Sequence, residues 1–231
     1  MSHLTVMSTE IKSLEAAKRA AQALGIPVLE GAKSVQSWYW GASPCDLVLG
    51  NDPGGYNFGL RREANGTYSL VGDSYDMPPS MKRLFGLFGD DFGGWAVETM
   101  SDPTGQRAPR SGHVTTGTPN RLMQEYALQV GELGARVNRM TSRRVSLKGG
   151  DVKLVITGGV IPAGGSVEIL AKRDGSATVG GFGIEGPACL KVSDWALKVI
   201  GQITSQELTA DFYHRRKAGK VAHVGALKAR R

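Results

Sequence analysis

The sequence is poor in the residues that build disulfide frameworks, metal centres and membrane spans. Its two cysteines, Cys45 and Cys189, lie far apart and form neither a disulfide framework nor a metal set, which favours a reducing cytoplasm. The four histidines are scattered without a His-x-x-x-His pair, so no metal site is expected. No run approaches the roughly 18 apolar residues of a membrane span, and no signal peptide is recognised. These absences predict a cytoplasmic protein without metal, cofactor or membrane contact.

Motifs of common catalytic classes are also missing. The glycine-rich stretch GGFGIEG is neither a P-loop nor a dinucleotide-binding fingerprint, because no Gly-Lys-Ser or Gly-Lys-Thr follows it. Its glycines could still form an anion-binding nest at the start of a helix. No Gly-x-Ser-x-Gly nucleophile elbow occurs in the chain. The sequence therefore makes no positive case for an enzyme.

All of the excess positive charge lies at the C-terminal end. The formal net charge is +7, and residues 214–231 contain seven basic residues and no acidic one. The seven are Arg215, Arg216, Lys217, Lys220, Lys228, Arg230 and Arg231. Without them, 21 basic residues of the total of 28 stand against 21 acidic ones, so the rest of the chain is formally neutral. This basic tail suits an arm that contacts nucleic-acid phosphate with little sequence specificity, a solubilising tail, or a segment that docks on an acidic partner.

Hydrophobic spacing predicts an α+β fold that starts with a strand and a helix. Residues 3–9 are expected to form the strand, and 14–24 carry apolar residues at helical spacing, with Gly25 placed to end the helix. Short runs rich in aromatic and branched residues then predict several strands, with hairpin turns at NDPGG and EANG. Residues 76–117 mix proline, glycine and charge, and we interpret them as a long insertion.

A second helix and a hairpin are predicted after the insertion. Thr118 and Pro119 form a helix-start signal, and Gly134 is expected to end the helix. The segment RLMQEYALQVGELG carries an apolar stripe that is expected to be buried and consists of Leu122, Met123, Tyr126, Val130 and Leu133. Two strands that turn at residues 148–150 follow. The first predicted domain, residues 1–157, is therefore an antiparallel sheet with helices on one face.

A smaller unit is predicted at the C-terminal end of the chain. Residues 158–164 are interpreted as a linker, 165–213 as a ββα domain, and 214–231 as the basic tail. A unit of about fifty residues is expected to need packing against the first domain or against a partner.

Cys189 is the best single candidate for a reactive group. It lies in GGFGIEGPACLKVSDWALKVIG, which predicts a glycine-rich approach to a helix capped by Gly186 with Pro187 as the first helical residue. In that first turn, the helix dipole and the free amides lower the pKa of a thiol. The alternative is a small buried cysteine that packs beneath the hairpin, since no Cys-x-x-Cys and no nearby histidine accompany it and Asp194 has the wrong sign.

The first part of the chain contains MSHLTVMSTEIKSLEAAKRAAQALG followed by WYWG, CDLVL, YNFGL and YSLVGDSY, and later RLMQEYALQV and a strand ending LVIT. In these segments it resembles a family found in cyanobacteria, plastids and other bacteria, which plastid genomes name among the hypothetical chloroplast reading frames. The insertion at about 76–117 is much longer than the connection usual in that family.

The C-terminal part contains the segments VEILAKRDGSATV, GFGIEGPACLKVSDWALKVIG and LTADFYHRR. In these segments it resembles a second, smaller family that is often encoded beside the first. The function of both families is unknown, and their genes tend to lie near an AAA-type ATPase. The resemblance therefore implies an accessory role in a complex, through an association and not through a mechanism.

Three functions follow as expectations. The first is a non-enzymatic accessory or adaptor protein of a cytoplasmic complex, associated with an AAA-type ATPase. The second is a nucleic-acid-associated protein that uses the basic tail. The third is a thiol-dependent activity at Cys189.

Overall fold

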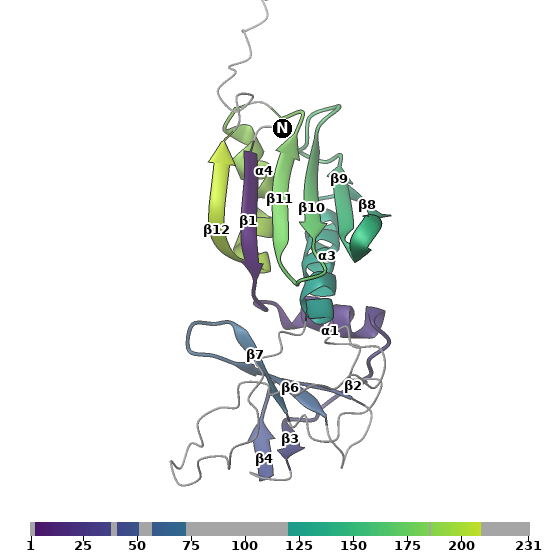
Figure 1. The fold of residues 1–231 in the computed structure, drawn as a ribbon, viewed down its shortest axis with the longest axis vertical. Helices are drawn as coiled ribbons and strands as arrows, with labels where there is room; N and C mark the ends of the chain where they lie inside the picture. Colours follow the sequence, from purple (N-terminus) through teal and green to yellow (C-terminus); the bar gives the residue numbers. More distant parts are fainter. Residues whose placement is uncertain (1–2, 38–40, 51–56, 73–119, 185, 209–231) are drawn as a thin grey trace, which may run out of the picture.

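The computed structural model describes residues 3–37, 41–50, 57–72, 120–184 and 186–208 (Figure 1). The predicted insertion at 76–117 and the predicted tail at 214–231 lie outside these ranges. Within them, antiparallel sheets and three α-helices confirm the predicted α+β class. The helices are α1 (Leu14–Ala23), α3 (Asn120–Val137) and α4 (Ala188–Ile200), and η1 (Lys148–Gly150) is a short 3-10 turn.

The largest sheet takes its strands from both ends of the described chain. Its strands are β1 (His3–Thr9), β8 (Thr141–Ser146), β9 (Val152–Thr157), β10 (Ser166–Ala171), β11 (Ala177–Phe182) and β12 (Gly201–Leu208). Their order is β12-β1-β11-β10-β9-β8, and every neighbouring pair is antiparallel (Figure 1). Because β11 and β12 both run antiparallel to β1, they run parallel to each other, and α4 makes the crossover between them.

Residues 165–208 do not have a sheet of their own. β10 pairs with β9 of the first predicted domain, and β11 and β12 enclose β1. The predicted linker, residues 158–164, joins the neighbouring strands β9 and β10. A single buried cluster includes Met7, Leu154 and Val179. A unit of about fifty residues buries too little apolar surface alone, so its strands complete a shared sheet.

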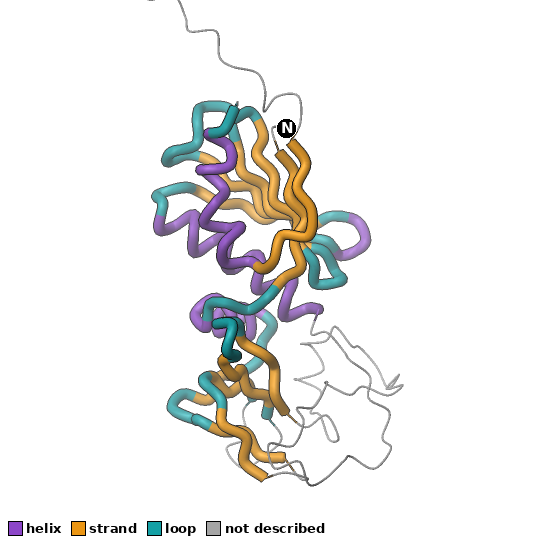
Figure 2. Tube along the Cα trace, turned by 90° about the vertical axis from the view of Figure 1, so that its left-hand side faces the viewer, coloured by secondary structure: helices purple, strands orange, loops and turns teal. Residues whose placement is uncertain are grey.

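The helices α3 and α4 lie on one side of the six-stranded sheet (Figure 2). Side chains along each strand alternate between the two sides of the sheet. Leu154, Ile156 and Ile169 face the helices and are fully buried. Val155 and Leu170 alternate with them on the other side and are half-buried. Among the helices that the structure describes, none covers this second side, which we call the open face.

The helix α1 is built from small residues and has well-defined ends. Ser13 Oγ accepts a hydrogen bond from the Ala16 amide at 3.3 Å, which satisfies one of the amides that a helix start leaves free. Ala17 and Ala21 are fully buried, and their small side chains let α1 pack closely against α3. The helix ends where the sequence predicted, because Gly25 follows it with a φ of 71°.

The helix α3 runs past the predicted stop at Gly134 and ends at Val137. The prediction was wrong because Gly134 serves packing, since a Cβ atom there would overlap with the ring of Trp195 on α4. Gly131 makes room in the same way for Leu154 of the sheet. Each interior glycine costs about 1 kcal/mol of helix propensity relative to alanine, and here it lets the helix approach its neighbours.

The end of α3 places an arginine where glycine is usual. The Met140 amide donates to Ala135 O at 2.8 Å and the Arg139 amide donates to Arg136 O at 3.2 Å, a Schellman arrangement that needs a left-handed residue. Arg139 supplies it with a φ of 55°, and no other non-glycine residue in the described ranges has a positive φ. This conformation costs a residue with a Cβ atom roughly 1 kcal/mol.

We expect Arg139→Gly to raise the free energy of unfolding by about 1 kcal/mol, because glycine adopts the left-handed conformation without strain. Arg136→Gly is the matched control, since Arg136 is an exposed residue with helical backbone in the last turn of the same helix. The control should lower stability by about 1 kcal/mol. Urea unfolding measures both changes, and equal losses in the two variants would contradict the strain at Arg139.

A small β lobe lies below α1 in Figure 1 and is formed by the described residues between 28 and 72. Its strands are β2 (Val28–Leu29), β3 (Ser34–Ser37), β4 (Gly41–Pro44), β5 (Leu47–Leu49), β6 (Phe58–Arg62) and β7 (Tyr68–Gly72). They form a four-stranded sheet, β2-β5-β6-β7, and a separate pair, β3-β4. The hairpin predicted at EANG joins β6 and β7, whereas the turn predicted at NDPGG falls on residues outside the described ranges. Phe58 and Leu60 extend the main buried cluster into this lobe.

Candidate functional site

Cys189 lies in the first turn of α4, where the sequence placed it. The cap is Pro187, one residue later than the predicted Gly186. The Cys189 side chain is fully buried in the main cluster, and its carbonyl accepts a hydrogen bond from Ser193 Oγ at 3.1 Å. A thiol without exposed surface offers a substrate no approach, so this position suits a packing role.

Neither cysteine is expected to react with iodoacetamide in the folded protein. Cys45 and Cys189 are both free and buried, and burial, with a smaller contribution from Asp46, raises the pKa of the Cys45 thiol. We expect labelling at neutral pH to be at least about a hundredfold slower in buffer than in urea. Mass spectrometry of the two peptides measures each site separately. Rapid labelling of Cys189 in buffer would instead support a thiol-dependent activity.

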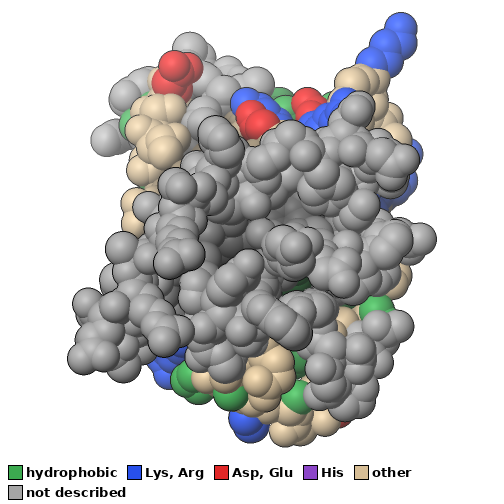
Figure 3. Space-filling view, turned by 60° about the horizontal axis from the view of Figure 1, so that its bottom comes forward, with side chains coloured by type: hydrophobic (Ala, Val, Ile, Leu, Met, Phe, Trp, Pro, Cys, Tyr) green, Lys and Arg blue, Asp and Glu red, His purple; other side chains and the backbone are tan. Residues whose placement is uncertain are grey.

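The charged side chains at the surface of α1 are paired with opposite charges. Arg19 Nε lies 2.6 Å from Glu15 Oε1, and Lys18 forms an ion pair with Glu30. Figure 3 shows acidic and basic side chains next to one another at the upper margin of the view. Exposed pairs of this kind contribute about 0–1 kcal/mol each and create no field of a single sign.

The remaining sequence-predicted contacts lie outside the described residues. These are the seven basic side chains of the tail, from Arg215 to Arg231. Across the described ranges, no three His, Cys, Asp or Glu side chains gather as a metal-binding group. No helix in those ranges is long and apolar enough to cross a membrane.

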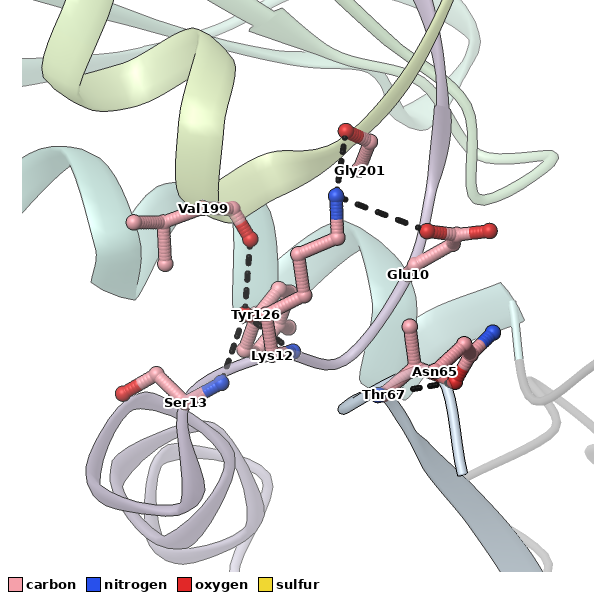
Figure 4. Close-up of polar contacts among 8 residues, drawn as sticks. All are labelled: Glu10, Lys12, Ser13, Asn65, Thr67, Tyr126, Val199 and Gly201. Carbon is pink, nitrogen blue, oxygen red and sulfur yellow. Dashed lines mark hydrogen bonds and ion pairs between the residues drawn. The ribbon is translucent and has the colours of Figure 1, made fainter. Parts of the chain in front are cut away.

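A polar junction connects the turn after β1 with α3 and with the end of α4 (Figure 4). Tyr126 of α3 lies at its centre and is fully buried. Its hydroxyl accepts hydrogen bonds from the Lys12 and Ser13 amides at 2.9 and 3.1 Å, and donates one to Val199 O at 2.9 Å. A single phenol oxygen therefore joins the start of α1 to the last turn of α4. We call this group the Tyr126 junction.

The side chain of Lys12 adds a charged contact to the junction. Its Nζ donates to Gly201 O at 2.8 Å and lies 3.5 Å from Glu10 Oε2. Glu10 Oε2 is buried and makes no hydrogen bond with the described residues, so the Lys12 ammonium supplies its compensating charge. The ammonium also lies at the C-terminal end of α4, where the last carbonyls carry partial negative charge.

The hairpin between β6 and β7 reaches the same segment of chain (Figure 4). The Tyr68 amide donates to Ile11 O at 2.7 Å. Within the turn, Asn65 Oδ1 accepts hydrogen bonds from the amide and the hydroxyl of Thr67 at 3.0 and 2.7 Å. Residues 10–13 therefore connect the six-stranded sheet, the helices and the small β lobe.

The Tyr126 junction has a structural role and not a catalytic one. The hydroxyl uses its hydrogen and both acceptor positions, and burial raises the pKa of Tyr126 to about 12 although two amides point at its oxygen. A phenol with this pKa stays protonated at neutral pH and does not serve as a general base. Sequence periodicity predicted that Tyr126 is buried, but it gave no signal for partners 113 and 73 residues away.

The strand β8 forms one edge of the six-stranded sheet (Figure 1). Its consecutive residues Arg143 and Arg144 lie on opposite faces of the sheet. Arg144 points toward α3, where its guanidinium binds both oxygens of Glu125 at 2.7 and 3.0 Å and Glu132 at 2.6 Å. Arg143 lies on the open face, opposite Val155 of β9, and is exposed. Within the described ranges, Arg143 has no acidic side chain within ion-pair distance.

The open face has a mixed composition. Its side chains on β8 to β11 include Arg143, Val145, Lys153, Val155, Glu168, Leu170, Thr178 and Phe182. Lys153 Nζ and Glu168 Oε2 form an ion pair across β9 and β10 at 3.1 Å. The apolar side chains Val155, Leu170 and Phe182 remain half-buried among these polar groups. Such a face tolerates water and can also be covered by another protein.

Comparison of the chain with family models, with curated proteins and with solved structures found no match. The family resemblances drawn from the sequence therefore remain predictions.

Proposed function

We propose that this chain is a non-enzymatic accessory protein that binds a partner protein through its six-stranded sheet. The observation that supports the proposal is the one-sided layering of that sheet, with α3 and α4 on one face and the open face on the other. The polar groups of the Tyr126 junction are committed to holding the fold together, and the Cys189 side chain has no exposed surface. Binding is therefore the role that this arrangement supports best.

The partner class that the family resemblance implies is an AAA-type ATPase. An accessory protein of this kind would change the ATPase rate or the position of the ATPase in a complex without reacting chemically itself. The nucleic-acid alternative depends on the basic tail, which lies outside the described residues. The thiol alternative has no supporting contact at Cys189, whose side chain is fully buried.

The proposal is tested by affinity capture from the native host with three forms of the chain. Leu170→Glu adds a charge to the open face, and Lys191→Glu adds one to an exposed position of α4 on the opposite side of the sheet. We expect a partner that the wild type and Lys191→Glu retain and that Leu170→Glu loses. Melting curves establish that both variants are folded. A wild type without a stable partner, or a partner held equally by all three forms, would contradict the proposal.

The proposed effect on an ATPase partner is tested with the purified ATPase, if the affinity capture recovers one. We expect its rate of ATP hydrolysis to change when the wild-type chain is added and to stay the same when Leu170→Glu is added. An unchanged rate with both proteins would exclude an ATPase-regulating role.

A further inference from the structure

The outer edge of β8 presents main-chain groups that no described residue uses. The Leu147 amide donates to Asp151 O at 2.9 Å, which makes Leu147 an inward, hydrogen-bonded position of the β8–β9 hairpin. Hydrogen-bonded positions alternate along an antiparallel ladder, so the amides and carbonyls of Ser142, Arg144 and Ser146 point outward. This edge can pair with one more strand.

The edge of β8 lacks most of the features by which sheets block further pairing. Natural edges are protected by proline, by bulges or by covering segments. β8 contains no proline, its register with β9 is regular, and five of its six residues are exposed. Its remaining protection is charge, but Arg144 is already paired with Glu125 and Glu132, whose two negative charges more than offset its positive one. Arg143 is therefore the uncompensated charge of the strand.

Further positive charge lies just before the strand. Arg136 and Arg139 are exposed at the end of α3, and neither forms an ion pair with a described carboxylate. Val137 between them is 81% exposed. The edge is thus bordered by three unpaired arginines and one exposed apolar side chain.

A second copy of this chain fits the edge poorly. Two β8 strands that pair symmetrically and antiparallel with the greatest overlap are centred on Arg143 or on Arg144. The first register places two unpaired Arg143 side chains directly opposite each other. The second brings together two copies of the Arg144–Glu125–Glu132 cluster, each with one excess negative charge. Like charges directly opposite each other destabilise an antiparallel pair. By contrast, an extended segment with acidic side chains places negative charge opposite Arg143. It can also form hydrogen bonds with the outward amides and carbonyls of β8.

We infer that the edge of β8 binds an extended, acidic segment of a partner protein, which adds to the sheet as a seventh strand. The inference rests on the proposed accessory function and names the segment of the partner that the sheet receives. Main-chain hydrogen bonds from Ser142, Arg144 and Ser146 supply affinity, and Arg143 selects acidic over basic segments. Nucleic acid would use the arginines but not the outward amides.

The test uses the full chain and a short peptide of alternating glutamate and threonine. Amide hydrogen exchange, read residue by residue by NMR, is measured with millimolar peptide, with the matching lysine–threonine peptide and with oligodeoxythymidine. We expect the glutamate peptide to slow exchange at Ser142, Arg144 and Ser146, and the lysine peptide to have no effect. Absence of protection, equal protection by both peptides, or binding of the oligonucleotide alone would overturn the inference.

Two pairs of variants separate the contribution of the main-chain hydrogen bonds to peptide binding from the contribution of the Arg143 charge. Ser142→Pro removes an outward amide without touching the β9 ladder, and Ser142→Ala keeps that amide. We expect about tenfold weaker peptide binding for the first and unchanged binding for the second. Arg143→Glu should weaken the glutamate peptide several-fold and favour the lysine peptide, whereas Arg143→Lys should keep the original preference.

The same variants distinguish failure of this inference from failure of the proposed function. If Ser142→Pro still captures the partner that Leu170→Glu loses, the accessory function stands and the edge of β8 is not its site. If the wild type captures no partner, the proposed function fails together with this inference, whatever the peptide does.

Discussion

Replacing Tyr126 with phenylalanine is expected to lower the free energy of unfolding by about 3 kcal/mol, although only one oxygen is removed. That oxygen satisfies the amides of Lys12 and Ser13 and the carbonyl of Val199. Each buried polar group left without a partner costs about 1–3 kcal/mol. The loss corresponds to a fall in the melting temperature of roughly 6–12 °C for a domain of this size.

Tyr68→Phe is the matched control for this experiment. Tyr68 is half-buried in β7, and no hydrogen bond of its hydroxyl is found among the described residues. Its replacement should change stability by less than about 1 kcal/mol. Equal effects of the two substitutions in urea unfolding would contradict the role of the Tyr126 hydroxyl.

The junction also predicts a dependence of stability on alkaline pH. Burial raises the pKa of Tyr126 to about 12, whereas a tyrosine in the unfolded chain has a pKa of about 10. The stabilisation is therefore complete below pH of about 10 and is lost as the unfolded chain ionises, up to pH of about 12. Over this window, the wild type should lose about 2–3 kcal/mol relative to Tyr126→Phe. A constant difference between the two proteins across this range would show that Tyr126 does not titrate in this way.

Gly134→Ala is expected to destabilise the protein by up to about 2 kcal/mol, against the usual rule for a helix interior. Alanine gains about 1 kcal/mol of helix propensity over glycine. At this position, however, its Cβ atom would overlap with the ring of Trp195, and forced overpacking costs about 1–3 kcal/mol. The contact between α3 and α4 must open to relieve the overlap.

Measuring the stability effect of Gly134→Ala in the Trp195→Leu variant tests whether the Trp195 ring is the cause. In Trp195→Leu the ring is absent, so Gly134→Ala should become neutral or stabilising, because only the gain in propensity remains. Urea unfolding of the four proteins gives the coupling between the two sites. Destabilisation of the same size in both backgrounds would mean that Trp195 is not what excludes the methyl group.

The sequence predicted features that depend on neighbours along the chain. Gly25 ends α1 as expected, because a glycine after a helical apolar pattern is a local signal. Gly134 gives the same local signal but lies inside a helix, and only the position of Trp195 on another helix explains it. A terminating glycine and a packing glycine therefore cannot be told apart from one sequence.

Contacts between distant segments were beyond sequence reasoning for the same physical reason. The α+β class follows from periodicity, but the pairing of β1 with β11 and β12 depends on which strands meet in space. Gln206 Nε2, for example, donates to Thr5 Oγ1 at 3.2 Å across 201 residues. Of the predicted functional residues, Cys189 was placed on the right turn, whereas the Tyr126 junction and the edge of β8 emerge only from the assembled sheet.

The position of β1 between β11 and β12 also determines when its two edges can be paired during synthesis of the chain. β1 leaves the ribosome before both of its partners and cannot be paired on both sides until the chain has been made as far as Leu208. Both edges of β1 are open until β11 has been made, and one edge stays open until β12 has been made. Closing a contact across so much intervening chain is slow. A nascent chain that stops before β12 leaves one edge of β1 exposed, so fragments of this protein are expected to be more prone to aggregation than the finished chain.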